Sequence, residues 1–242
     1  MSVAVAIPCY NEERTIGKVV SDFRQALPDS TILVFDNGST DGSFDAARNA
    51  GADVFREERR GKGYVVQNIF RTVDADICVL VDGDDTYPAE DVHSLLAPLL
   101  DGEADMVVGN RLEDASGKSL ARVRRLGNLV FLGLVNLLTR QSFQDVLCGF
   151  RAVNRRFLDS VTPASGAFEI ETELTLRAVS AGMRIREVRI GYRPRPEGSY
   201  SKLHPFKDGC RILLMIAKLL VQSRSLHARP VRPLPRGPGS GW

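Results

Sequence analysis

The chain has 242 residues, of which 43% are hydrophobic and 26% are charged, a composition typical of a globular protein with one large domain. Its formal net charge is only +2, and its Lys and Arg residues are dispersed among acidic ones, which argues against nucleic acid as a partner. The four cysteines are far apart and form no CxxC pair. We interpret them as buried thiols of a reducing compartment.

The apolar segments are too short to cross a membrane. Residues 1–8 have no basic cluster and no apolar run long enough for a signal peptide. Leu126–Leu138 and Ile212–Val221 are interrupted by polar residues, so neither reaches the ~20 apolar residues of a spanning helix. We therefore expect a cytoplasmic protein that is able to lie peripherally on the cytoplasmic face of the membrane.

Short apolar runs alternate along the chain with segments of helical period, which is the pattern of βαβ units. The predicted fold class is α/β, with a mainly parallel central sheet flanked by helices. The expected strands are Val3–Ile7, Ile32–Phe35, Asp53–Phe55, Ile77–Val81, Met106–Val108 and Ile185–Ile190. The expected helices are Glu12–Ala26, Ser43–Ala50, Gly63–Thr72, Ala89–Leu100 and Glu171–Ala181.

The domain organisation follows from a change in composition near the C-terminus. Residues 1–222 are predicted to form a single domain that ends in an amphipathic helix over 204–222. Beyond Gln222 the chain is rich in Pro, Gly and Arg and has no periodicity. Residues 223–242 are therefore predicted to be a disordered tail.

Polar clusters follow several of the expected strands. The first strand is expected to stop at Pro8, which cannot donate a ladder hydrogen bond, and Asn11 is expected to cap the helix that follows. Further clusters follow later strands at Asp36–Gly42, Arg59–Gly63 and Asp82–Tyr87. Because ligands of open α/β sheets bind at the carboxyl ends of the strands, these clusters predict a ligand site at that edge.

The segment Asp82-Gly83-Asp84-Asp85 places three carboxylates in one turn after an apolar strand. Such a cluster repels itself unless a cation binds to it, and oxygen ligands favour Mg²⁺ or Mn²⁺ shared with phosphate oxygens. The alternative is an exposed acidic turn in which Asp84 or Asp85 caps the next helix. The neighbouring polar clusters favour the metal and diphosphate interpretation.

Other segments carry candidate binding groups, each with a turn or surface loop as its alternative. Asp36, at a strand end, is assigned to the base or ribose of a nucleotide. Lys62 and Gly63 fit the close approach of an anion at a helix start. Arg111 is either a surface residue or a diphosphate ligand. The cationic segment Tyr192–Leu203 is either a surface loop or a lid that neutralises a departing diphosphate.

Together these motifs resemble family 2 glycosyltransferases of the GT-A fold, in particular the branch with dolichol-phosphate mannose synthases and polyprenyl-phosphate glucosyltransferases. The similarity runs from about Val3 to about Lys218, and its motifs follow the family's order. They are Ile7–Glu12, Asp36–Gly42, Gly61–Gly63, Asp82–Asp84, Gly109–Arg111, Asp145–Arg151 and Ser201–Leu203.

The resemblance implies roles for individual residues. Asp82 and Asp84 would be the metal ligands. Asp84 and Asp145 would be the catalytic residues, with Asp145 orienting the acceptor or acting as a base. The nucleotide-sugar site would comprise Pro8, Tyr10, Asn11, Glu12, Asp36, Asn37, Ser39, Lys62, Gly63, Asp82, Gly83, Arg111, Arg195, Ser201 and Lys202.

The sequence departs from the family in two places. Thr86 stands where many relatives have a Gln near the metal. The chain also continues into a polar segment where relatives often have transmembrane helices.

The activity implied by the resemblance is metal-dependent transfer of a hexosyl group from a UDP- or GDP-sugar to a polyprenyl phosphate of the dolichol or undecaprenyl type, with inversion. The alternative is the same donor chemistry on a soluble small molecule or a peptide. A sugar nucleotidyltransferase is disfavoured because Pro8–Glu13 contains no glycine. A further alternative is a module that binds a nucleotide-sugar without catalysing a reaction.

The expected partners also include a membrane surface and a second copy of the chain in a homo-oligomer. Leu126–Leu138 and Phe206–Gln222 would contact lipid, or else pack as helices of the domain core.

Overall fold

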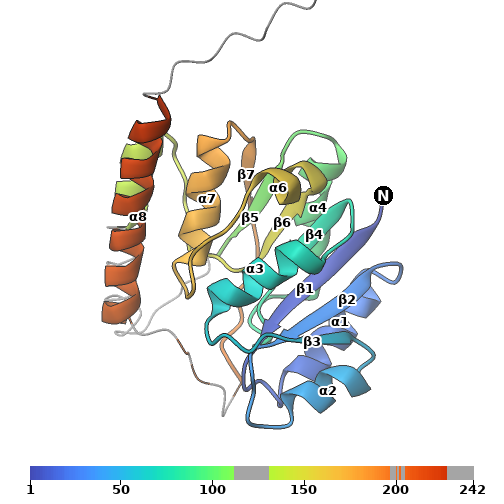
Figure 1. Cartoon of the computed structure of the whole chain (residues 1–242). Coiled ribbons are helices and arrows are strands. Elements are labelled where there is room, and N and C mark those ends of the chain that lie inside the picture. Colours follow the sequence, from blue (N-terminus) through green and yellow to red (C-terminus); the bar gives the residue numbers. More distant parts are fainter. Residues whose placement is uncertain (112–130, 197–199, 201, 203–204, 228–242) are drawn as a thin grey trace, which may run out of the picture.

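In the computed structural model, the described residues are 1–111, 131–196, 200, 202 and 205–227. Within them, seven strands form one sheet in the order β3-β2-β1-β4-β6-β5-β7, and helices lie on both of its faces (Figure 1). The strands are β1 Val3–Cys9, β2 Thr31–Asp36, β3 Asp53–Arg56, β4 Ile77–Leu80, β5 Met106–Asn110, β6 Arg151–Asn154 and β7 Ile185–Arg189. The predicted α/β class is confirmed.

The helices fill the connections between the strands. They are α1 Ile16–Ala26, α2 Ser43–Asn49, α3 Lys62–Thr72, the 3-10 turn η1 Ala89–Asp91, α4 Val92–Leu100, α6 Arg155–Ser160, α7 Ile170–Ser180 and α8 Pro205–His227. A further helical segment covers 131–139. In α1 the buried residues are Ile16, Val19, Val20 and Phe23, a spacing that places all of them on one face of the helix.

The sheet is parallel from β3 through β2 and β1 to β4, and β7 is parallel to β5. Strand β6 lies between β4 and β5 and is antiparallel to both. The sequence did not predict β6, because its four residues include only two apolar ones and begin with an arginine. That arginine, Arg151, is 1% exposed, and its guanidinium donates to the carbonyls of Val146 and Cys148 and to the hydroxyl of Thr175. The sequence also missed α6, which follows β6 directly.

The prediction that Pro8 ends the first strand is wrong, because β1 continues to Cys9. The Cys9 carbonyl accepts a hydrogen bond from the Asn37 amide on the β2 side, and the Ala6 carbonyl accepts one from the Val81 amide on the β4 side. Along a central strand, the backbone polar groups of successive residues point alternately to the two neighbouring strands. Pro8 is two residues after Ala6, so its backbone nitrogen and carbonyl point to the β4 side. The paired part of β4 ends opposite Ala6. The missing N–H of Pro8 therefore interrupts no ladder.

The prediction that Asn11 caps the first helix is also wrong. Helix α1 begins at Ile16, and Thr15 occupies its N-terminal cap. Asn11 instead has a positive φ of 53°, a conformation that asparagine tolerates better than most residues. Its side-chain oxygen accepts a hydrogen bond of 2.8 Å from the Thr40 amide. Asn11 therefore joins the loops that follow β1 and β2.

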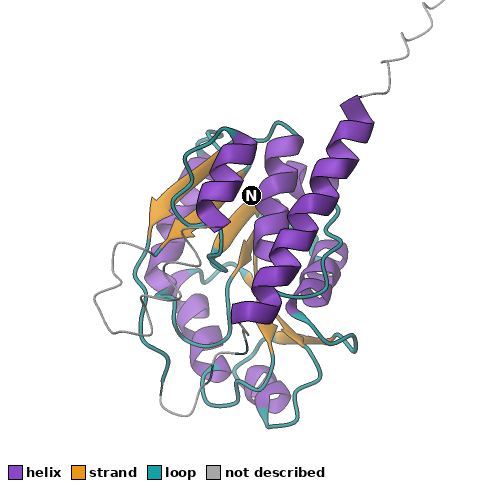
Figure 2. Cartoon of the chain, turned by 90° about the vertical axis from the view of Figure 1, so that its left-hand side faces the viewer, coloured by secondary structure: helices purple, strands orange, loops and turns teal. Residues whose placement is uncertain are grey.

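A second apolar cluster lies beside the main core, beneath α8. It contains Val135, Phe143, Val146, Leu176, Ile212 and Ile216. Helix α8 runs along the flank of the molecule against the segment 131–139 and α7 (Figure 2). Within the described chain, no helix combines the length and the apolar character needed to cross a bilayer.

The boundary predicted for the C-terminal helix needs correction. Helix α8 extends past Gln222 to His227, because residues 223–227 contain neither proline nor glycine to end it. The rest of the predicted tail, 228–242, lies outside the described residues, as does 126–130 of the first predicted lipid-contacting segment.

Candidate active site

The loops that follow β1, β2 and β4 meet at one edge of the sheet, as the sequence predicts. The Thr15 hydroxyl, before α1, donates a hydrogen bond of 2.7 Å to the Gly83 carbonyl after β4. The Asn11 amide donates to the Ser39 hydroxyl after β2 at 3.0 Å. The first contact fixes the acidic loop Asp82–Asp85 against the loop that follows β1, and the second joins that loop to the one that follows β2.

Asp82 belongs to a partly buried charge cluster with Lys62 and Glu171. The Lys62 ammonium lies 2.5 Å from a carboxylate oxygen of Asp82 and 2.7 Å from one of Glu171. Burial by itself raises the pKa of Asp82, but the Lys62 charge outweighs it and the pKa falls below its ordinary value. Burial lowers the pKa of Lys62, but the two carboxylates have the larger effect, and the pKa rises above its ordinary value. Both Asp82 and Lys62 are therefore ionised near neutral pH.

Gly149 lets the chain pass directly over this charge cluster. A Cβ atom at this position would lie 2.5 Å from a carboxylate oxygen of Asp82 and 3.0 Å from the ammonium of Lys62. A side chain here therefore displaces one or both of the charged groups. The same small site is lined by Pro8 and Arg151.

We expect Gly149→Ala to weaken binding of a nucleotide-sugar by at least about tenfold, because the added methyl group pushes Asp82 away from Lys62. The matched control is Gly133→Ala, since no described atom lies within 4 Å of a Cβ placed there. The nucleotide-sugar concentration that gives half of the maximal thermal shift measures the effect in each variant. If the two variants need the same nucleotide-sugar concentration for half of the maximal thermal shift, the Asp82–Lys62 pair is not part of the nucleotide-sugar site.

Asp84 is 3% exposed and is fixed by its neighbours on both carboxylate oxygens. One oxygen accepts hydrogen bonds from the amide and hydroxyl of Thr86, and the other lies 2.5 Å from the guanidinium of Arg195. The alternative that Asp84 or Asp85 caps the next helix is wrong. Pro88 caps η1 and Asp91 caps α4, and neither helix start receives a side-chain hydrogen bond from its cap.

Two cations of the segment that follows β7 reach the acidic residues. Arg195 pairs with Asp84, and its other terminal nitrogen is buried with no hydrogen-bond partner among the described residues. The Lys202 ammonium pairs with the Glu12 carboxylate and donates to the Asn11 carbonyl at 3.2 Å. Burial raises the pKa of Glu12, and Lys202 offsets part of that rise. A buried guanidinium nitrogen without a partner is a donor that an anion such as phosphate satisfies.

Arg111 and Asp145 form a second buried ion pair. Asp145 is 3% exposed, and one of its oxygens accepts a hydrogen bond of 2.8 Å from Arg111. Its other oxygen accepts one from the Leu147 amide. Arg111 also donates to the Tyr87 hydroxyl at 3.2 Å and to the Leu147 carbonyl. Asp145 therefore orients Arg111 in this structure, and its predicted role toward an acceptor stays a prediction.

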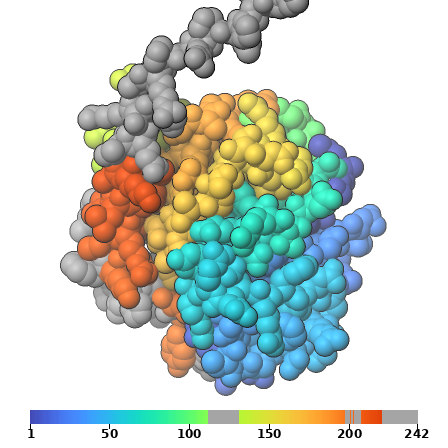
Figure 3. All heavy atoms as spheres, viewed as in Figure 1, coloured from blue at the N-terminus to red at the C-terminus, as the bar shows by residue number. Residues whose placement is uncertain are grey.

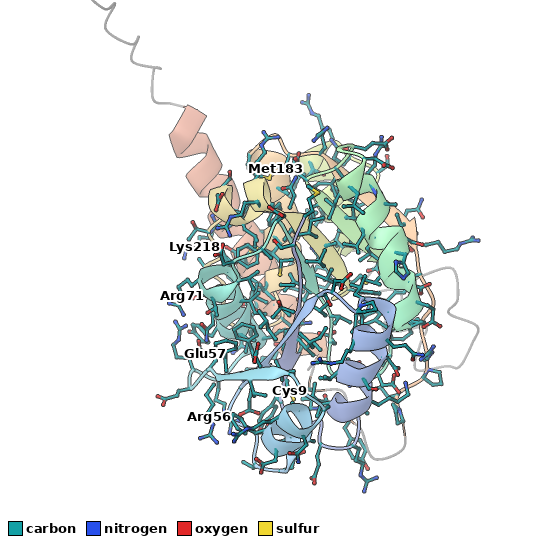
Figure 4. The ribbon with its side chains drawn as sticks, turned by 90° about the vertical axis from the view of Figure 1, so that its right-hand side faces the viewer. Cys9, Arg56, Glu57, Arg71, Met183 and Lys218 are labelled. Carbon is teal, nitrogen blue, oxygen red and sulfur yellow. The ribbon has the colours of Figure 1, made fainter. Side chains whose placement is uncertain are left out.

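The remaining nucleotide-side candidates lie after β2 and β1. The Asp36 carboxylate accepts from the Ser39 amide. The Asn37 side chain spans to the end of β3, where it donates to the carbonyl of Glu57, labelled in Figure 4, and accepts from the Gly61 amide. The Arg60 guanidinium stacks over the Tyr10 ring at 4.5 Å.

The close backbone approach predicted at Gly61 and Gly63 occurs, but its partner is the chain itself. Gly61 has a φ of +136°, and a Cβ there would collide with the Gly166 carbonyl. A Cβ at Gly63 would collide with the Ser165 carbonyl. Packing against 165–166 accounts for the absence of a side chain at these two positions, and the predicted contact of Gly63 with an anion stays a prediction.

Several residues of the site were missed at the sequence level. They are Glu171 and Glu187, of which Glu187 accepts from the Gln144 and Asp145 amides. Tyr87 lies in the predicted cluster Asp82–Tyr87, but its contact with Arg111 was not predicted. Nothing in the linear pattern links these residues to their partners. Ser201, a predicted residue of the nucleotide-sugar site, lies outside the described residues.

The donor set after β4 fits a hard divalent cation that is shared with a substrate. Asp82 and Asp84 offer carboxylate oxygens, and each already neutralises a cationic side chain. Among the described residues, no group of three or more His, Cys, Asp and Glu side chains is placed to hold a metal by itself. Mg²⁺ commonly binds through one or two carboxylates and completes its shell with waters and phosphate oxygens. The site therefore suits a metal that binds together with a diphosphate.

The fold is shared with solved glycosyltransferases of the GT-A type. Glucosyl-3-phosphoglycerate synthase from Mycobacterium tuberculosis, crystallised with Mn²⁺, UDP and glucosyl-3-phosphoglycerate, is 25% identical with a TM-score of 0.75. The alignment covers 92% of this chain and 80% of that chain. The fold and site define the class of protein as a GT-A glycosyltransferase.

Sequence relatives narrow this class to a family. The chain matches the glycosyl transferase family 2 over residues 4–162, and it belongs to that family. Glycosyltransferase AglJ of Haloferax volcanii is 36% identical over 88% of this chain and 70% of its own length. Dolichyl-phosphate hexose transferase of the same organism is 33% identical over 92% of this chain and 95% of its own length.

Proposed function

We propose that the chain transfers a hexosyl group from a UDP- or GDP-sugar to a polyprenyl phosphate, with inversion at the anomeric carbon. The observation that carries this proposal is the buried Asp84, which lies at the end of a central strand and faces the guanidinium of Arg195. A carboxylate beside a cation whose second nitrogen has no partner among the described residues suits a metal-bound diphosphate. The relative named dolichyl-phosphate hexose transferase, which matches over nearly all of both chains, supports the acceptor.

In this proposal a bound Mg²⁺ or Mn²⁺ supplies Lewis-acid stabilisation of the diphosphate, with Asp82 and Asp84 as its protein ligands. Mn²⁺ and UDP in the glucosyl-3-phosphoglycerate synthase structure support this choice of cofactor and donor. The chain's own cations share the task. Arg195, Lys202 and Arg111 bind phosphate oxygens and stabilise the charge that develops as the diphosphate departs.

The chemical step needs no proton transfer when the acceptor is a phosphate. An anionic phosphate oxygen attacks the anomeric carbon from the side opposite the diphosphate and forms the new C–O bond. The bond to the diphosphate breaks, and its electron pair leaves with the nucleoside diphosphate. Because the phosphate is already an anion near neutral pH, a strong base at Asp145 is unnecessary, whereas an alcohol acceptor would require one.

A second candidate is the same transfer to a soluble acceptor. The solved structures of glucosyl-3-phosphoglycerate synthase with phosphoglyceric acid favour this alternative. The acceptors named for the two relatives have a phosphate in common, which suits the same set of cations. The identity of the acceptor therefore separates the two candidates.

Product extraction tests the proposal. The chain is incubated with Mn²⁺, a radiolabelled nucleotide-sugar, and either polyprenyl phosphate, polyprenol or phosphoglycerate. We expect label in the organic phase with polyprenyl phosphate and none with polyprenol, because the alcohol is not an anion. If label stays wholly in the aqueous phase with polyprenyl phosphate, the lipid acceptor is wrong, and transfer to phosphoglycerate then supports the second candidate.

We also propose that the protein acts in the cytoplasm, in contact with the cytoplasmic face of the membrane. Contact with the membrane is what a polyprenyl acceptor requires. The predicted homo-oligomer stays a prediction.

A further inference from the structure

The outward face of α8 combines exposed leucines with a strip of cations. Leu213 is 46% exposed and Leu214 is 70% exposed. At about 100° per residue, Leu213, Leu214, Cys210 and Ala217 fall on one side of the exposed face. The interpretation of all four cysteines as buried is therefore wrong for Cys210, because it lies on this outward side of α8. Lys207, Arg211 and Lys218 fall on the other side of the same face. The exposed surface of α8 is therefore divided lengthwise into an apolar strip and a basic strip.

Among the described residues, these two leucines do not belong to the apolar cluster beneath α8. The opposite face of α8 supplies Ile212 and Ile216 to the second apolar cluster, where they are 4% and 2% exposed. The neighbouring helical segment 131–139 adds Leu137, which is 76% exposed. Large apolar side chains that face water on two adjacent helices indicate a surface that is covered in the working state.

The figures show this surface on the outside of the molecule. Figure 2 places α8 in front of the other helices, and Figure 3 shows it in orange and red at the flank of the space-filling view. Figure 4 labels Lys218 on the same helix. In the described part of the chain, no element packs against the exposed side of Leu214.

The charges on this face select the kind of partner. Between Lys207 and Leu219 the only acidic residue of the sequence is Asp208, which is 4% exposed and lies 3.3 Å from Arg211. A second copy of the chain that docked through this face would bring like charges together without acidic residues from the same stretch to pair with them. Anionic lipid headgroups pair with such cations, while leucines enter the boundary of the acyl chains.

We propose that the outer face of α8 docks flat on an anionic lipid bilayer, an inference that rests on the proposed polyprenyl acceptor and names the surface from which it is reached. Lys202, which contacts Glu12 in the candidate site, lies shortly before α8 in the sequence. Docking through α8 therefore holds the start of this helix, and the site beside it, close to the headgroups where a polyprenyl phosphate exposes its phosphate.

Co-sedimentation of the full chain with vesicles that contain no polyprenyl phosphate tests this surface. Wild type is expected to bind vesicles of phosphatidylcholine with phosphatidylglycerol, and to bind pure phosphatidylcholine much less. Replacing both leucines, Leu213→Ser and Leu214→Ser, is expected to weaken binding at least about tenfold. The control is Leu100→Ser on α4, a leucine that is 52% exposed and lies away from α8, and it should bind as wild type does.

A second variant tests the basic strip without touching the leucines. Lys207→Gln together with Lys218→Gln is expected to weaken binding about tenfold at low salt and to remove most of its salt dependence. The docking surface is wrong if either double variant binds as Leu100→Ser does. It is also wrong if the leucine variant changes only the oligomeric mass of the free protein, since the face would then join two copies.

The outcomes separate this proposal from the proposed function. If the chain binds vesicles through α8 but transfers no sugar to polyprenyl phosphate, the docking surface is supported and the proposed acceptor is wrong. If the chain transfers sugar to polyprenyl phosphate but does not bind vesicles, the docking surface is wrong and the proposed acceptor is supported.

Discussion

Asp84→Asn is expected to lower turnover by at least about 100-fold, because it removes the negative charge that the proposed metal and the diphosphate share. The substitution preserves size and leaves an oxygen that accepts from the amide and hydroxyl of Thr86, so the loop keeps its shape. Turnover with a nucleotide-sugar and Mn²⁺, together with calorimetric titration of Mn²⁺ in the presence of UDP, measures the effect. We expect Mn²⁺ binding to be lost together with turnover.

The matched control for this prediction is Asp85→Asn, the same charge change at the next residue. Asp85 pairs with Lys18 at 2.9 Å and with Arg193 at 3.9 Å, and neither of these cations contacts Asp84. A loss smaller than about tenfold is expected there, the scale of a screened surface ion pair. Turnover that survives in Asp84→Asn, or an equal loss in both variants, would remove Asp84 from the proposed metal site.

Arg195→Met is expected to change metal affinity and turnover in opposite directions. Without nucleotide, Arg195 occupies the Asp84 oxygen that a metal would use, at 2.5 Å. Removing its charge should therefore tighten Mn²⁺ binding to the nucleotide-free protein by about tenfold, the effect of losing a competing partly buried ion pair. Turnover should fall by about 100-fold, because a cation that stabilises the departing diphosphate is lost. Calorimetry without nucleotide gives the first quantity and a transfer assay the second.

Arg193→Met is the control for Arg195. Arg193 belongs to the same segment but pairs with Glu90 at 3.0 Å and with Asp85, so its removal should leave Mn²⁺ affinity within about twofold of wild type. If Arg195→Met weakens Mn²⁺ binding and turnover together, Arg195 supports the acidic loop and does not compete with the metal.

The position of the site could be predicted from the sequence because it depends on a general property of parallel sheets. The loops at Asp36 and Asp82 follow strands that the pattern of apolar residues reveals, and carboxyl ends of parallel strands meet at one edge. The Thr15 bond to Gly83 and the Asn11 bond to Ser39 confirm that meeting.

The partners within the site could not be predicted, because they depend on tertiary packing. Lys62 contacts Glu171 only because α7 packs against α3. The Glu171 side chain lies in a helix whose sequence gives no sign of which neighbour it faces. The same holds for β6, where a buried arginine contradicts the usual composition of a central strand and is explained only by the carbonyls around it. Local pattern therefore located the site, and long-range packing completed it.

The contact between Lys202 and Glu12 has a consequence for how the chain acquires its activity. The two residues are separated by 190 positions in the sequence, and such a contact forms only after most of the domain has been ordered. During synthesis the first strands and the acidic loop leave the ribosome long before the segment with Arg195 and Lys202 does. A nascent chain that already contains the whole acidic loop therefore lacks the cations that complete the site. Donor binding is then expected only after the segment with Arg195 and Lys202 has folded.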